Sequence, residues 1–153
     1  KRKGLLKAIK IVASIREHSD PRARLDIYGP DSDDLPRWIR GLDWVRCAGY
    51  AKAPYTSYDV LLHPATTEPF GMVVTESRAS GIPCLISDCV GAKDLGLSAI
   101  EVVAFDAPIS VWASKLVSIV KNGMVKPEVI WHWNDLAMVH LPHYRRINDS
   151  LAR

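Results

Sequence analysis

The stretch His63-Pro64-Ala65-Thr66-Thr67-Glu68-Pro69-Phe70-Gly71-Met72-Val73-Val74-Thr75-Glu76 decides the fold of this chain. The apolar run that leads into it, residues 59–63, predicts a strand that stops at Pro64. Residues 72–80 have helical spacing and are followed by Gly81, a residue typical of the position after a helix. A strand that leads through a turn into a helix is typical of an open α/β sheet, where ligands bind at the carboxyl ends of the strands.

Helical and strand-like segments alternate along the rest of the chain, which predicts an α/β fold with a parallel sheet and helices on both of its faces. The spacing predicts helices from Leu5 to an end at Ser19-Asp20-Pro21, around Trp38, over 72–80, over 109–120 and in the aromatic tail after Pro127. It predicts strands over 24–28, 44–49, 59–63, 84–87 and 100–103. Because a doubly wound sheet usually begins with a strand and this chain opens on a helix, we expect a first strand upstream of Lys1.

The composition excludes several classes of protein. With 153 residues, 48% hydrophobic and 24% charged, the chain is expected to form one soluble globular domain. No apolar run is long enough to span a membrane, and the first residues, Lys1-Arg2-Lys3-Gly4, lack the apolar core of a signal peptide. Three cysteines without CxxC spacing favour a reducing compartment, so we expect a cytoplasmic protein. A net charge of +3 from scattered side chains is too weak to indicate a nucleic-acid partner.

The turn and the start of its helix carry groups suited to a phosphorylated ligand. Free backbone N–H groups of residues 70–73 and the helix dipole together form a site for phosphate. If Glu68 lies in the turn and Glu76 on the second helical turn, both carboxylates border one pocket and accept hydrogen bonds from hydroxyls. Hydroxyls next to a diphosphate are the recognition elements of a nucleotide sugar.

These residues resemble the donor-binding C-terminal domain of the retaining GT-B glycosyltransferases, whose signature is two glutamates separated by seven residues. Here the signature runs from Glu68 to Glu76. The resemblance extends to Lys3-Gly4, to the strand-then-glycine segments 25–29 and 45–49, and to Gly81-Ile82-Pro83, so it covers nearly the whole chain. It implies that residues 1–153 are one Rossmann-like nucleotide-sugar-binding domain, the C-terminal half of a GT-B fold, without its first strand and without the N-terminal acceptor domain.

The resemblance also implies roles for individual residues. Glu76 would hold the ribose hydroxyls, Glu68 would contact the donor sugar, and Lys3 would neutralise the diphosphate as it leaves, so Lys3 and Glu68 are the expected catalytic residues. The other residues expected to bind the donor are Pro69, Phe70, Gly71, Met72, Val73, Gly29 and His63. Arg78 and Ser80 depart from the family pattern, which has small apolar residues there.

The activity implied is transfer of a hexose from a UDP- or GDP-sugar to a glycan or lipid-linked acceptor held by the other domain, without a metal or other cofactor. The run His63-Pro64-Ala65 is similar to bacterial lipopolysaccharide-core glucosyltransferases and favours a UDP-sugar. The same resemblance implies a role in cell-envelope polysaccharide synthesis and peripheral contact of the full-length protein with the inner membrane.

Other functions compete with this interpretation. Asp31-Ser32-Asp33 spells the DxD with which GT-A glycosyltransferases hold a divalent metal, although acids also suit a turn and an N-cap here. His132, His140 and His143 raise a zinc hypothesis, but their spacing does not converge on one helical face. Two alternative functions are a non-catalytic nucleotide- or sugar-binding regulatory module and a GT-B-like nucleotide-sugar epimerase.

Overall fold

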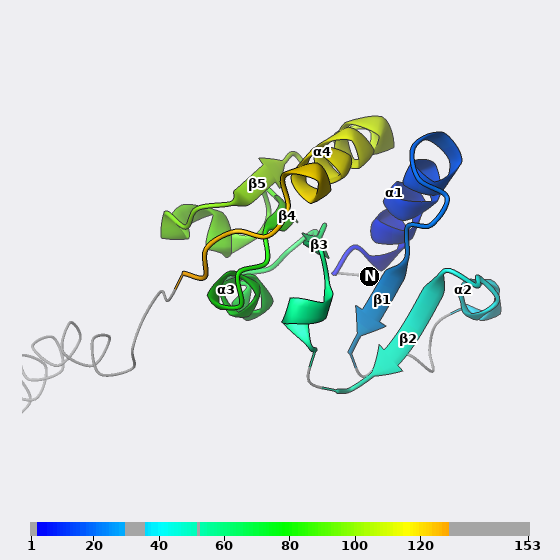
Figure 1. Cartoon of the computed structure of the whole chain (residues 1–153), viewed down its shortest axis with the longest axis horizontal. Helices are drawn as coiled ribbons and strands as arrows, with labels where there is room; N and C mark the ends of the chain where they lie inside the picture. Colours follow the sequence, from blue (N-terminus) through cyan, green and yellow to red (C-terminus); the bar gives the residue numbers. More distant parts are fainter. Residues whose placement is uncertain (1–2, 30–35, 52, 129–153) are drawn as a thin grey trace, which may run out of the picture.

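Helices and parallel strands alternate in the computed structural model, which describes residues 3–29, 36–51 and 53–128 (Figure 1). The helices are α1 (Leu5–His18), α2 (Arg37–Arg40), α3 (Met72–Ala79) and α4 (Ile109–Asn122), and the strands are β1 (Leu25–Tyr28), β2 (Val45–Gly49), β3 (Leu61–His63), β4 (Cys84–Ser87) and β5 (Ile100–Val103). The elements predicted within these residues are all present. Two short 3₁₀ turns, Tyr55–Ser57 and Gly91–Leu95, were not predicted. The helix expected after Pro127 lies outside the described residues.

The strands are parallel, as expected, but they form two sheets in place of the single one expected. β1 pairs with β2, and β3, β4 and β5 pair in that order. Side chains, not a backbone ladder, connect the two sheets in the described part of the chain. The hydroxyl of Tyr58, which lies shortly before β3, donates to Oδ2 of Asp26 on β1 at 2.7 Å and lies 2.7 Å from the hydroxyl of Tyr28.

Helices cover both faces of the sheet that contains β4. All four residues of β4 are buried, as is typical of a strand covered on both sides. Cys84 and Ile86 pack with Val74 of α3, whereas Leu85 points to the opposite face and packs under α1 and α4. None of the described helices has the length and apolar composition needed to cross a membrane.

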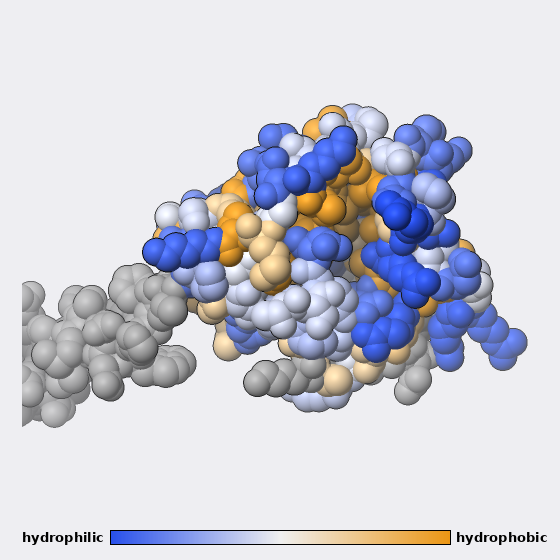
Figure 2. Space-filling view, in the orientation of Figure 1, coloured by the Kyte–Doolittle hydropathy of each residue, from blue (hydrophilic) through white to orange (hydrophobic). Residues whose placement is uncertain are grey.

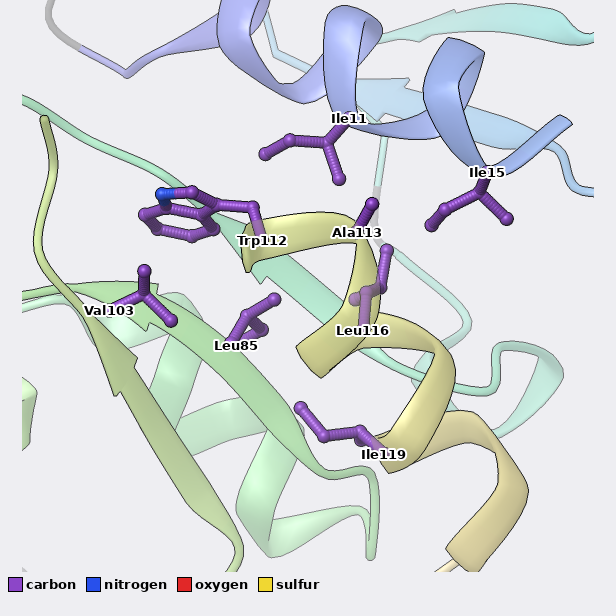
Figure 3. Packing of buried hydrophobic residues seen from close by; sticks show 8 residues of the cluster. All are labelled: Ile11, Ile15, Leu85, Val103, Trp112, Ala113, Leu116 and Ile119. Carbon is purple, nitrogen blue, oxygen red and sulfur yellow. The ribbon is translucent and has the colours of Figure 1, made fainter. Parts of the chain in front are cut away.

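Helix α1 contributes to two apolar cores. Ile9 packs with Ile39 of α2 over the β1–β2 sheet. Ile11 and Ile15 point to the other side, towards Trp112 and Leu116 of α4 (Figure 3). Helical periodicity makes this possible because residues two apart in sequence lie on different faces of the helix. The start of α1 is therefore fixed relative to both sheets, and this positions Lys3.

Candidate functional site

The turn that carries Glu68 joins the end of β3 to the start of α3 and is fixed against the segment after β4. The Glu68 N–H donates to the Cys89 carbonyl at 3.1 Å, and the Gly91 N–H donates to the Glu68 carbonyl at 2.9 Å. A Cβ atom at position 91 would lie only 1.9 Å from the Pro69 carbonyl oxygen, so this close approach requires glycine. The hydrogen bonds and the close contact both fix the backbone of the turn against residues 89–91.

Glu76 lies on the second turn of α3, as the sequence predicted, with an exposed side chain. Its Oε2 atom accepts a 2.6 Å hydrogen bond from the hydroxyl of Tyr55. Burial and the adjacent carboxylate both raise the pKa of Tyr55, so the phenol remains a donor. Tyr55 was not predicted as a site residue, because the 3₁₀ turn that presents it has no periodic pattern in the sequence.

Lys3 reaches Glu68 because the residue after it packs on the end of β3. Gly4 caps α1 with φ of +70°, and a Cβ atom there would lie 1.7 Å from the Pro64 carbonyl oxygen. Only glycine allows both the left-handed backbone and this contact. The Lys3 ammonium group forms an ion pair with Oε2 of Glu68, and this contact holds the pKa of the Glu68 carboxyl below its usual value.

His63 is a buried side chain that faces the Lys3–Glu68 ion pair. It is the last residue of β3 and is only 8% exposed. Its Nε2 atom lies 3.8 Å from Oε2 of Glu68, too far for a hydrogen bond. Burial lowers the pKa of His63, the Lys3 cation lowers it further, and the Glu68 carboxylate opposes the shift, so the neutral ring is favoured at neutral pH.

The remaining predicted residues divide into those that surround the start of α3 and one that does not. Phe70, Met72 and Val73 are 48%, 63% and 37% exposed, and Pro69 is exposed as well. Gly71 is the N-cap of α3 and offers no side-chain cap, and, after Lys3, its N–H helps to lower the pKa of the Glu68 carboxyl, which therefore lies at the positive end of the helix dipole. Gly29 ends β1, where its N–H bonds to the Gly49 carbonyl at 2.9 Å, and no hydrogen bond between described residues connects it to either glutamate.

Arg78, one of the departures from the family pattern, has a structural role. Its guanidinium group is fully buried and donates to the carbonyls of Ser98, Ile82 and Lys126 at 2.7, 3.3 and 3.1 Å. It also contacts Glu128 at 3.4 Å. Arg78 therefore anchors the segment after α4 to the far end of α3, away from the first turn. Ser80, another departure, donates from its hydroxyl to the Glu76 carbonyl at 2.9 Å.

Both metal hypotheses concern residues outside the described part of the chain, namely Asp31, Asp33, His132, His140 and His143. Among the described residues, no three potential ligands gather in a way that would hold a metal ion. The cysteines, Cys47, Cys84 and Cys89, are all described and are free thiols.

Comparison with known proteins gives concordant matches. The family model "Glycosyl transferases group 1" matches residues 1–123. The putative glycosyltransferase EpsF of Bacillus subtilis (strain 168) is 37% identical over 75 residues, which cover 48% of this chain and 20% of EpsF. WaaG, a glycosyltransferase involved in lipopolysaccharide biosynthesis, is 22% identical in its crystal structure, with a TM-score of 0.65 over 78% of this chain and 35% of WaaG.

A second solved structure, Anabaena Alr3699/HepE in complex with UDP-glucose, is 18% identical, with a TM-score of 0.60 over 79% of this chain and 35% of HepE. Both solved structures share the fold described above. The chain matches about a fifth of the length of EpsF and about a third of the length of each solved protein.

Proposed function

The chain belongs to the group 1 glycosyl transferases, and from this we propose that the start of α3 is the nucleotide-sugar donor site of the enzyme. The proposal rests on the placement of the two signature glutamates. Glu68 lies in the turn before α3 and Glu76 on its second turn, and each is contacted by a side chain from a distant segment. Beside an uncapped helix start, they offer acceptors for hydroxyls next to donors for phosphate.

Each group has a distinct role in this proposal. Glu76 binds the ribose hydroxyls and Glu68 the hydroxyls of the donor sugar. The backbone at the start of α3 and the Lys3 ammonium group bind the diphosphate and stabilise the charge that develops on it as the sugar leaves. The positive groups needed for this come from the chain itself, so we propose a metal-independent reaction that retains the configuration of the sugar.

The substrates are proposed from the relatives and the sequence together. HepE was solved with UDP-glucose, and His63-Pro64-Ala65 favours the same nucleotide, so UDP-glucose is the first donor to test. The acceptor is proposed to be a glycan or a lipid-linked sugar bound by another domain, with the reaction on the cytoplasmic side of the membrane. The free thiols of the described chain support a reducing compartment.

The break between the two sheets supports the expectation of a further strand. Within the described residues, β1 and β3 are each paired along one edge only, and Figure 2 shows apolar surface in the hollow between α4 and α1. We propose that a strand between β1 and β3 unites the sheets in the longer enzyme. In a form extended upstream, backbone amides of β1 and β3 should exchange more slowly with solvent than in this chain. Unchanged exchange would refute the added strand.

Calorimetric titration tests the donor site. The chain should bind UDP and UDP-glucose in EDTA, and Glu76→Ala should weaken binding by about 1.5–3 kcal/mol for each lost hydrogen bond to a charged group. Because Glu76 is exposed and its only loss among the described residues is the hydrogen bond from Tyr55, the free energy of unfolding should fall by no more than about 1.5 kcal/mol. Glu101→Gln, a change on β5 that removes an exposed ion-pair partner of Lys115, serves as the matched control.

The outcomes separate the competing sites. Binding only after addition of Mn²⁺ would favour Asp31 and Asp33. No binding of UDP or GDP, with or without their sugars, would refute the donor site. Equal losses of binding and stability in Glu76→Ala would assign Glu76 a structural role.

A further inference from the structure

His63 holds a polar atom whose hydrogen-bonding capacity is unused. Nε2 of His63 is buried and has no hydrogen-bond partner within the described chain. Buried polar atoms are nearly always paired, because an unpaired one loses its hydrogen bond to water without replacement. The nearest acceptor identified for it is Oε2 of Glu68, 3.8 Å away. An atom that is unpaired in the free protein at this place points to a partner gained in another state.

Lys3 and His63 approach the same oxygen atom. The Lys3 ammonium group contacts Oε2 of Glu68, the atom that His63 faces. The two competitors differ in mobility: the Lys3 side chain is 68% exposed, whereas that of His63 is 10% exposed and sits at the end of β3. Lysine is a flexible chain with a point charge at its end, so Lys3 is the partner able to leave.

On the basis of the proposed donor site, we propose that His63 is a positioning residue that takes over Oε2 of Glu68 when Lys3 turns to the diphosphate of the donor. Lys3 exchanges one anion for another, and no proton moves, because the neutral imidazole donates from Nε2–H. A shift of about 1 Å closes the present separation of 3.8 Å to hydrogen-bond length. Glu68 then keeps a fixed orientation towards the sugar at the moment when it loses its cation.

This exchange gives the nucleoside diphosphate and the sugar separate contributions to binding. The nucleoside diphosphate removes Lys3 from Glu68, and the sugar then uses the carboxylate that His63 holds. Loss of the His63 N–H should therefore weaken binding of the nucleoside diphosphate, because Glu68 is left without a partner when Lys3 turns away, and should also reduce the additional affinity that the sugar provides. A histidine that only filled space would affect both ligands equally or neither.

Proton NMR of the His63 ring tests the exchange without any ligand. In Lys3→Ala, Oε2 of Glu68 becomes free, so the Nε2–H resonance of His63 should shift downfield to a hydrogen-bonded position and exchange more slowly with water. Lys3→Arg retains a cation and should resemble the wild-type chain. A His63 resonance in Lys3→Ala at its wild-type position would overturn the inference, whatever the chain binds.

Calorimetry with UDP and UDP-glucose provides the second test. His63→Phe keeps a ring but lacks the N–H, and should bind UDP about three- to tenfold more weakly than wild type while also losing about tenfold of the gain from the sugar. His63→Gln places an N–H near the position of Nε2 and should restore that gain. If both variants retain the full gain, His63 does not position Glu68. If the wild-type chain binds neither UDP nor GDP, the proposed donor site itself is wrong.

Discussion

The hydroxyl of Tyr55 donates a 2.6 Å hydrogen bond to Oε2 of Glu76, across 21 residues of sequence. A carboxylate has further lone pairs, so this bond orients Glu76 and leaves the other oxygen for a ligand. Tyr55→Phe keeps the ring and removes only the hydroxyl. We expect a 3- to 30-fold loss of UDP affinity, about 0.7–2 kcal/mol, measured by calorimetry. Tighter binding by the variant would instead mean that Tyr55 competes with the ligand.

The contact between Gly4 and Pro64 predicts a large effect for a small substitution. Gly4→Ala places a methyl group 1.7 Å from the Pro64 carbonyl oxygen, at φ of +70°. Gly96→Ala is a matched control, since Gly96 has φ of +67° and open space around it. Backbone strain should cost both variants about 1 kcal/mol of unfolding free energy, and the clash should cost Gly4→Ala at least about 1–3 kcal/mol more in chemical denaturation.

In Gly4→Ala the start of α1 must move off β3, so Lys3 should also lose its contact with Glu68. Weaker UDP binding is therefore expected in the folded fraction of this variant and not in Gly96→Ala. Equal stability and equal binding of the two variants would contradict the close packing of Gly4.

Removal of the buried Arg78 guanidinium group should destabilise the domain. Arg78→Met leaves the carbonyls of Ser98 and Lys126 without their donor, and a loss of about 3–5 kcal/mol of unfolding free energy is expected. Lys115→Met, which breaks an exposed ion pair with Glu101 at 3.0 Å, should cost less than about 1 kcal/mol. Similar denaturation midpoints for the two variants would show that burial of Arg78 adds little.

The lowered pKa of His63 predicts a dependence of stability on pH. Because the folded pKa lies below the usual 6.5, protons bind the unfolded chain more readily. Stability is therefore highest above about pH 6.5 and falls as the pH decreases through the folded pKa. The pKa of the Glu68 carboxyl is also lowered, so stability decreases further as the pH falls below 4.5, the usual pKa of a glutamate. Among the described residues, Lys3 is the other charged group that faces this pair.

Denaturation of His63→Gln between pH 8 and 5 measures this contribution. The variant should show a flatter decline than wild type, and His18→Gln, a change at an exposed position of α1, serves as the matched control. Parallel curves for wild type and His63→Gln would show that protonation of His63 does not affect folding.

The helices and strands could be predicted because each depends on a pattern within a short stretch of sequence. β4 is a short apolar run between Pro83 and Gly91, and α4 has an apolar face at helical spacing after Pro108. The placement of Glu68 and Glu76 relative to α3 followed from one turn and one helix start.

The contacts within the site could not be predicted in the same way, because they join distant segments. Lys3 meets Glu68 across 65 residues through the packing of Gly4, and Tyr55 meets Glu76 from an irregular turn. The break between β1 and β3 was also missed, since apolar patterns identify strands but not which strands pair. The unpaired state of His63 Nε2 depends on all of these contacts.

Helix α1 has a consequence for how the domain unfolds. Two sheets without a shared backbone ladder would ordinarily be free to melt separately. Ile9 belongs to the core of one sheet, while Ile11 and Ile15 belong to the core of the other. Loss of this single helix exposes both cores at once, so the two halves should denature in one cooperative transition.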